Sequence, residues 1–167
     1  IAVRDVPFKT QGMFGLYLGS DGLIFPPLPN LIFTRDTSAW VYGGVTLNPM
    51  HWPARRQETL LTAAVYKFHP RFANNKFEIW FGNPDQDFGP ATLEGGDIMP
   101  IGNGVVLVGM GERSTPQAVG QLARSLFKSG PETRVVACQL PKATPTNQLA
   151  TGLALCKREP ATSFLGV

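Results

Sequence analysis

Two aspartates and two arginines stand at matching distances along the chain and, together with one glutamate, indicate its chemistry. Asp36 and Asp97 lie 61 residues apart, and Arg55 and Arg113 lie 58 residues apart. Glu94 precedes the second aspartate, with two glycines between them. If these residues converge, with acids at one end of a site and arginines at the other, they suit a ligand with a cationic head and an anionic tail. An amino acid is such a ligand, because arginine holds a carboxylate through paired N–H donors.

Each of these residues also has a purely structural interpretation. Asp36 and Asp97 are equally compatible with turn residues or with ion-pair partners of Arg35 and nearby lysines. The segment 94–97 is either a simple turn or a place where the backbone approaches a ligand closely, since glycine has no Cβ. Arg55 stands at the start of a predicted helix, where its charge opposes the helix dipole, and this favours a role beyond helix stability.

Two amphipathic helices are predicted, over residues 54–68 and 116–128, because apolar residues recur there at helical spacing. The second helix has Thr115 as N-cap, Pro116 in its first turn and Gly130 after its end. The apolar stripe of the first helix consists of Leu60, Leu61, Ala64, Val65 and Phe68, and that of the second of Val119, Leu122, Ala123, Leu126 and Phe127.

Strands are predicted around both helices. Residues 39–42 and 45–47 flank the turn Gly43-Gly44, and residues 98–101 and 105–108 flank the turn 102–104. A further strand is expected at 77–81, and a buried one at 134–140.

The order acid, hairpin, methionine, arginine, helix and strand occurs twice, which predicts an α/β fold built from ββαβ units. The whole chain, 1–167, is expected to be one partial catalytic domain. Its units are approximately 30–85 and 90–141, with an incomplete third unit at 145–167. Such units leave sheet edges open, so a homo-oligomer or a partner that covers them is expected.

Composition excludes several classes of protein. With 43% hydrophobic and 16% charged residues, the 167-residue chain can bury a core and is not a disordered tail. Its net charge of +3 is dispersed, which argues against nucleic-acid binding. No apolar run is long enough to span a membrane, and the first residues do not read as a secretory signal. Cys138 and Cys156 are interpreted as reduced thiols in a cytoplasmic protein, and no metal cluster is visible.

Several short motifs resemble arginine deiminase of the guanidino-modifying superfamily, in order and in spacing, over nearly the whole chain. The motifs are Asn30 to Asp36 (NLIFTRD), Leu47 to Met50 (LNPM), Arg55 to Thr59 (RRQET), Leu93 to Asp97 (LEGGD), Gly109 to Arg113 (GMGER) and Leu140 to Lys142 (LPK). The resemblance implies an α/β propeller of five ββαβ units, of which this chain holds two and the start of a third. It also implies hydrolysis of L-arginine to L-citrulline and ammonia through a cysteine-bound amidino intermediate, with no cofactor or metal.

The resemblance also implies roles for individual residues. Asp36 would hold the guanidinium group, Glu94 would bind it too and support a catalytic histidine, and Asp97 would be a supporting acid. The substrate's α-carboxylate would be held by Asn30, Arg55 and Arg113, and its methylenes would pack on Phe33.

Two departures from the family pattern bear on activity. The motif His-Leu-Asp-Thr, which carries the catalytic histidine, is replaced by the segment 148–151, Gln-Leu-Ala-Thr. Gln148 cannot shuttle protons near neutral pH, and Ala150 cannot accept a hydrogen bond from the substrate. The nucleophilic cysteine is expected beyond Val167, and neither Cys138 nor Cys156 matches its motif.

The chain alone is therefore predicted to be inactive. One alternative is a non-catalytic module that binds arginine or assembles with itself. Another is a sister enzyme that acts on agmatine or methylated arginines. The two arginines argue against agmatine, which has no carboxylate for them to bind.

Overall fold

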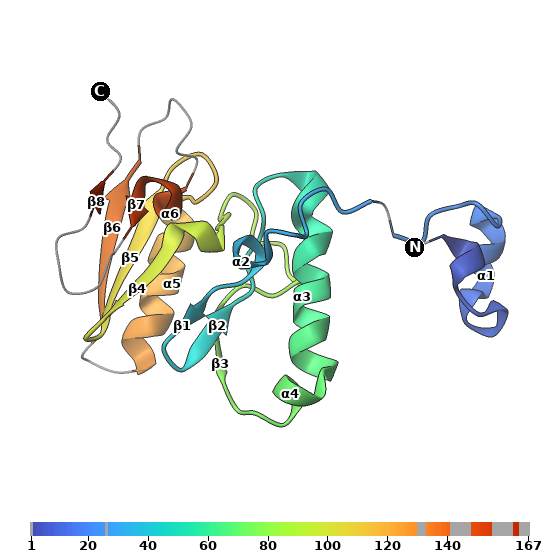
Figure 1. Cartoon of the computed structure of the whole chain (residues 1–167), viewed down its shortest axis with the longest axis horizontal. Helices are drawn as coiled ribbons and strands as arrows, with labels where there is room; N and C mark the ends of the chain where they lie inside the picture. Colours follow the sequence, from blue (N-terminus) through green and yellow to red (C-terminus); the bar gives the residue numbers. More distant parts are fainter. Residues whose placement is uncertain (1, 26, 130–132, 141–147, 155–161, 164–167) are drawn as a thin grey trace.

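Two small sheets, each with one long helix, form the body of the protein in the computed structural model (Figure 1). The structure describes residues 2–25, 27–129, 133–140, 148–154 and 162–163. The helices are η1 (Val3–Asp5), α1 (Phe8–Leu18), α2 (Thr34–Thr37), η2 (Pro53–Arg55), α3 (Arg56–Phe68), α4 (Pro70–Ala73), η3 (Gly95–Asp97), α5 (Pro116–Ser129) and α6 (Leu149–Gly152). The strands are β1 (Trp40–Val41), β2 (Gly44–Thr46), β3 (Glu78–Phe81), β4 (Ile98–Gly102), β5 (Val105–Met110), β6 (Arg134–Gln139), β7 (Leu153–Ala154) and β8 (Thr162–Ser163).

The two larger sheets have the same topology. In the order β1-β2-β3, and again in β4-β5-β6, an antiparallel hairpin is followed by a helix and by a strand that pairs in parallel with the second hairpin strand. The predicted ββαβ order is therefore present twice. The described residues form open sheets and no closed one, so the five-unit ring stays an expectation from the family resemblance.

The two hairpin turns show how local sequence sets the register. The second turn is Asn103-Gly104, and both residues have positive φ (50° and 70°), as a two-residue turn of type I′ requires. The first turn was predicted at Gly43-Gly44, and this is wrong by one residue: Val41 pairs with Gly44, so the turn is Tyr42-Gly43. Gly44 lies inside β2, where it pairs with Glu78 of β3, and only glycine fits there because a Cβ would overlap the carbonyl oxygen of Glu78.

Helix α5 covers the second sheet as predicted. Leu122 and Leu126 on its apolar stripe are completely or almost completely buried, and they pack in one core cluster with Val106 and Val108 of β5. Phe127, at the end of the stripe, is exposed. Core residues from the first sheet, such as Val41, join the same cluster, so one core serves both repeats.

Helix α3 departs from the prediction, because its apolar stripe is not buried. Leu60, Val65 and Phe68 are 41%, 48% and 71% exposed. The buried face instead carries Glu58 and Thr59. This helix is fixed to the body by polar contacts, among them the hydrogen bond that Thr59 Oγ1 donates to the backbone oxygen of Asn48 (2.7 Å).

Strand β6 was predicted to be buried and is largely exposed. It is the edge of its sheet and pairs only with β5 among the described strands, so one side of its backbone and much of its surface have no neighbour. Val136 illustrates this with 45% exposure.

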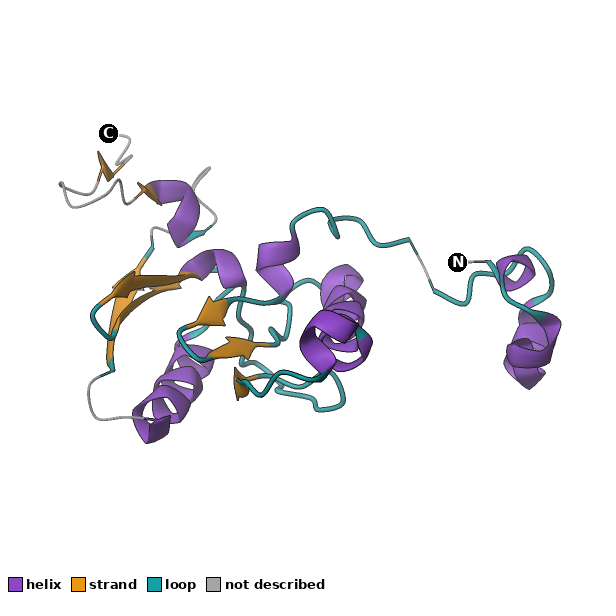
Figure 2. Ribbon diagram, turned by 60° about the horizontal axis from the view of Figure 1, so that its bottom comes forward, coloured by secondary structure: helices purple, strands orange, loops and turns teal. Residues whose placement is uncertain are grey.

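The segment with η1 and α1 lies apart from the sheets (Figures 1 and 2). Its apolar side chains Met13 and Tyr17 are strongly exposed. Every described helix is too short or too polar to cross a lipid bilayer.

Candidate functional site

The two predicted aspartates occupy equivalent places. Asp36 lies in α2 and Asp97 in η3, which are single-turn helices directly before the two hairpins. The turns contact each other, because the guanidinium of Arg35 donates to the backbone oxygens of Ile98 (2.7 Å) and Gly95 (3.3 Å). A Cβ at Gly95 would overlap the carbonyl oxygen of Arg35, so only glycine permits this approach. The two repeats therefore meet at their acids.

Arg55 joins the first aspartate to helix α3. Its Nη1 donates to Asp36 Oδ2 (2.9 Å), and its Nε and Nη2 both donate to Glu58 Oε2 (3.1 and 2.9 Å). The backbone oxygen of Asn30 accepts a further bond from Nη2 (3.4 Å). Burial lowers the pKa of this guanidinium, but the hydrogen bonds to Glu58 and Asp36 and the negative charges of these two carboxylates together raise it overall. Arg55 is thus a buried cation held by two carboxylates.

Glu94 lies between the two predicted arginines and is completely buried. Its Oε2 accepts a hydrogen bond from Arg113 Nη1 (3.1 Å), while Arg55 Nη1 is 4.0 Å from its Oε1. Within the described part of the chain, Glu94 Oε1 and Arg113 Nε have no hydrogen-bond partner. Among the described residues, the carboxylate thus keeps one buried oxygen without a hydrogen bond.

Gln148, at the start of α6, bridges acids from both repeats. Its Nε2 donates to Glu94 Oε2 (2.6 Å) and to Asp36 Oδ1 (3.0 Å). The prediction identified this position only as a departure from the family motif. Its contact with Asp36 spans 112 residues and leaves no local signal in the sequence.

Asp97 lies behind this cluster. The Ser114 hydroxyl donates to its Oδ2, and the Leu149 N–H donates to its Oδ1 (2.8 Å). Burial, and to a smaller extent the nearby Glu94, raise the pKa of the Asp97 carboxyl, which is about 6 in the folded protein. The two hydrogen bonds and Arg113 act in the opposite direction. Asp97 therefore positions η3 and α6, and its carboxyl is protonated at a higher pH than that of a free aspartate.

This shift predicts a pH dependence of stability. The folded pKa of Asp97, about 6, lies above the value of about 4 expected in the unfolded chain. The folded state therefore binds the proton more tightly, and the stability from this group is complete below pH 4 and is lost as the pH rises through 6. As the pH rises from 4 to 7, we expect the unsubstituted protein to lose about 2 to 3 kcal/mol of unfolding free energy relative to Asp97→Asn, which has no carboxyl to titrate at this position. Urea unfolding at both pH values measures this difference, and a difference that stays constant would contradict the shift.

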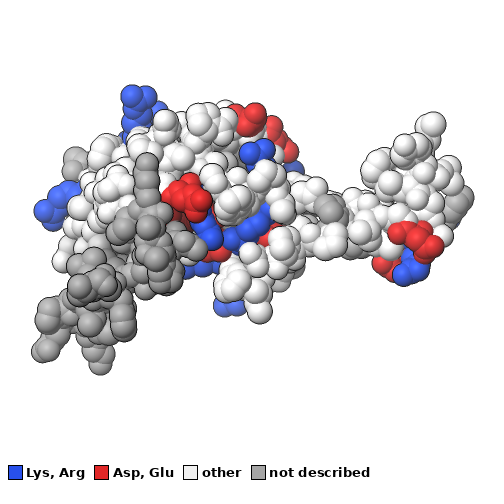
Figure 3. Space-filling view, turned by 90° about the horizontal axis from the view of Figure 1, so that it is seen from above, with Lys and Arg blue, Asp and Glu red and all other residues white. Residues whose placement is uncertain are grey.

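The predicted separation of acids and arginines is wrong. Arg55 and Arg113 form ion pairs with Asp36 and Glu94, so the charges alternate within one cluster. Viewed from above, the surface of the molecule also has basic and acidic atoms side by side near its middle (Figure 3). Opposite charges attract most strongly at short distance when water is excluded, which explains why they interleave.

The remaining predicted residues lie near the cluster. The backbone N–H of Asn30 donates to Glu58 Oε1 (3.1 Å), and Phe33 precedes α2 with an exposed ring. Glu58 and Ser114 were not predicted to belong to the site. The i, i+3 spacing of Arg55 and Glu58 on a helix was the available signal for the first of them.

Cys138 is half-buried and unpaired, while Cys156 lies outside the described residues. Over the part of the chain that the structure describes, no group of histidine, cysteine and acidic side chains is arranged to hold a metal ion.

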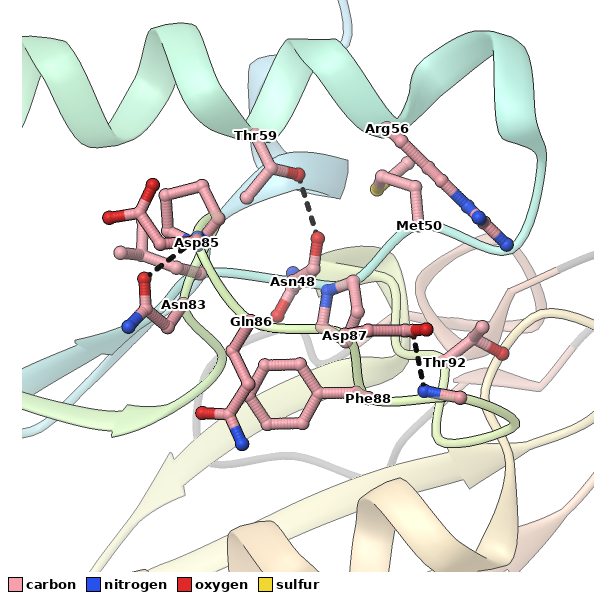
Figure 4. A pocket seen from close by; sticks show the side chains of 14 residues that line it. Asn48, Met50, Arg56, Thr59, Asn83, Asp85, Gln86, Asp87, Phe88 and Thr92 are labelled. Carbon is pink, nitrogen blue, oxygen red and sulfur yellow. Dashed lines mark hydrogen bonds between the residues drawn. The ribbon is translucent and has the colours of Figure 1, made fainter.

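Asn48 links the cluster to a neighbouring cavity of about 280 Å³ (Figure 4). Its Nδ2 donates to the backbone oxygen of Asp36 (2.8 Å), which fixes the turn that carries this acid. Its Oδ1 is buried without a hydrogen-bond partner among the described residues. Thr59 and Thr92 also line the cavity, whose far side is the loop 83–89.

Solved structures show the same fold. A structure of dimethylarginine dimethylaminohydrolase with an adduct of S-methyl-L-thiocitrulline has a TM-score of 0.62 and 23% identity, over 81% of this chain and 47% of that one. DDAH from Pseudomonas aeruginosa, complexed with citrulline, has a TM-score of 0.58 and 24% identity, over 77% of this chain and 44% of that one. The chain thus has the fold of dimethylarginine dimethylaminohydrolase and spans about half the length of these structures.

The family model of arginine deiminase matches residues 5–167. The chain therefore belongs to the arginine deiminase family, as its motifs predicted.

Proposed function

We propose that the protein recognises the guanidinium group of L-arginine, as part of a hydrolase that acts on a guanidino C–N bond. One observation carries the proposal: Asp36 and Glu94, from different repeats, both accept hydrogen bonds from the same nitrogen, Gln148 Nε2. Two carboxylates that converge on one N–H donor suit a planar cation with several N–H groups. The family match supports the same chemistry.

The charges of the cluster support a cationic ligand. The buried side chains are the acids Asp36, Glu58, Glu94 and Asp97 and the arginine Arg55, with Arg113 partly exposed beside them. Even with Asp97 protonated, the acids outnumber the arginines. Since an uncompensated buried charge is costly, a bound cation would stabilise the site.

The two arginines differ in what they can offer to an α-carboxylate. Arg55 already uses four N–H donors on Asp36, Glu58 and the backbone of Asn30. The side chain of Arg113 is 21% exposed, and its Nε is unpartnered within the described residues. We propose Arg113 as the main carboxylate ligand, with Asn30 beside it and the exposed ring of Phe33 along the methylenes.

Hydrolysis would follow the family chemistry. A cysteine thiolate attacks the guanidinium carbon, the C–N bond breaks and ammonia leaves; water then cleaves the C–S bond and releases citrulline. Gln148 carries no basic nitrogen that could move the protons. We therefore propose that this chain by itself binds L-arginine without converting it.

Calorimetry with L-arginine tests the proposal. We expect Asp36→Asn and Glu94→Gln each to weaken binding by about 10- to 100-fold, because hydrogen bonds to charged groups contribute about 1.5 to 3 kcal/mol. Asp85→Asn is the matched control, since this exposed acid lies on the loop 83–89. Arg113→Ala should weaken L-arginine binding more than agmatine binding.

Two results would count against this function. If neither acid substitution changed the affinity for L-arginine, the result would contradict a guanidinium site between Asp36 and Glu94. Formation of citrulline by the 167-residue chain, abolished by Glu94→Gln, would contradict the expected lack of turnover.

A further inference from the structure

Gln148 is in the place where the guanidinium group of the proposed function would bind. Its carboxamide nitrogen bridges Glu94 Oε2 and Asp36 Oδ1, and so uses both of its N–H groups on the two acids. We propose that this carboxamide is an internal competitor that fills the guanidinium site and that a ligand must displace. The inference rests on the proposed function and concerns how the site selects its ligand.

The backbone around the carboxamide leaves room for it. A Cβ on Gly96 would overlap Gln148 Oε1, so the absence of a side chain at position 96 lets the amide lie against the backbone of η3. This close approach explains why the second of the two positions between the acids of the segment 94–97 is a glycine. The sequence left open whether this segment is a simple turn or a place where a ligand approaches the backbone, and in this structure the side chain of residue 148 makes the close approach.

The carboxamide satisfies the site only in part. It is neutral, so it adds hydrogen bonds but no positive charge to a cluster with more acids than arginines. It also leaves Glu94 Oε1 without a partner in the described structure. A guanidinium group carries a full charge and N–H donors on three nitrogens, so it could reach both oxygens of Glu94 as well as Asp36. A cation should therefore displace the amide, whereas a neutral ligand gains much less by doing so.

Displacement needs no movement of the main chain. The backbone N–H of Leu149 is fixed by Asp97 Oδ1 (2.8 Å), directly after Gln148. The glutamine side chain has three rotatable bonds and is only half-buried. Rotation of this side chain would open the space between Asp36 and Glu94 while α6 keeps its contact with η3.

Calorimetry on Gln148→Ala tests the inference. We expect this variant to bind L-arginine about tenfold more tightly than the unsubstituted protein, because the ligand no longer has to break the two amide hydrogen bonds. The affinity for citrulline, whose ureido group is neutral, should change much less. Gln148→Asn has a side chain that is shorter by one methylene and cannot bridge both acids. Its affinity for L-arginine should therefore lie between those of the unsubstituted protein and of Gln148→Ala. Gln121→Ala, an exposed substitution of the same type on α5, should bind as the unsubstituted protein does.

The outcomes separate the inference from the function on which it rests. Equal or weaker binding of L-arginine by Gln148→Ala, with binding by the unsubstituted protein retained, would overturn the inference and leave the function intact. Absence of binding by all of these proteins would overturn both. Far-UV circular dichroism shows whether Gln148→Ala is folded, and the Gln148→Asn result decides if it is not.

Discussion

Replacing Arg55 with alanine is expected to lower the free energy of unfolding by about 3 to 5 kcal/mol, which is the cost of removing one partner from a buried ion pair. The guanidinium is the only cation in contact with both Asp36 and Glu58 among the described hydrogen bonds and ion pairs. Without it, these buried carboxylates would face each other and Glu94 with too little compensating charge. A loss of this size is a large part of the 5 to 15 kcal/mol that stabilises a typical domain.

Arg56→Ala is the control for this substitution. The adjacent arginine is exposed, so the change should alter the free energy of unfolding by no more than about 0.5 kcal/mol. Urea unfolding followed by circular dichroism measures both variants. If Arg55→Ala and Arg56→Ala differed by less than about 1 kcal/mol, the buried network would not hold the first repeat together.

Leu122→Ala is expected to cost about 2 to 5 kcal/mol, because it opens a cavity in a completely buried part of the core. Leu122 lies on the face of α5 that packs in the core cluster shared by both sheets. The loss combines the transfer of the side chain to water with the cavity that the surrounding core cannot refill.

A second leucine gives the comparison. Leu60 lies on the predicted apolar stripe of α3 but is 41% exposed, so Leu60→Ala should cost less than about 1 kcal/mol. The same urea titration serves both variants. Equal losses would mean that the stripe of α3 is covered in solution.

Repetition made the two acids predictable. Asp36 and Asp97 were matched by their spacing, and in the two copies of the ββαβ unit they lie in equivalent turns. Helical and strand periodicity located α5 and β5 for a similar reason, since the pattern arises from the backbone geometry itself.

Periodicity could not show what covers an apolar face. The stripe of α3 has the same spacing as that of α5, yet only the second meets a sheet in the described structure. Strand β6 illustrates the same limit, because an apolar run does not reveal whether a strand is central or at an edge.

The geometry of the site depends on contacts between distant parts of the chain. Gln148 donates a hydrogen bond to Asp36, which is 112 residues away, and Glu94 accepts one from Arg113 on a different loop. The residue types predicted that acids and arginines share one site, and the structure brings them together in one cluster. Their alternation follows from which buried atoms come within hydrogen-bond distance, and the folded chain alone determines that.

Because the two repeats meet where α2 contacts η3, a ligand bound there would also hold the repeats together. Asp36 belongs to the first repeat and Glu94 to the second, and no strand hydrogen bonds join the two sheets among the described residues. A cation held between these acids would be a non-covalent cross-link across that boundary. By mass action, a ligand at 100 times its Kd would add about 2.7 kcal/mol to the stability of the pair. Recognition of the ligand and cohesion of the two repeats would then be the same event.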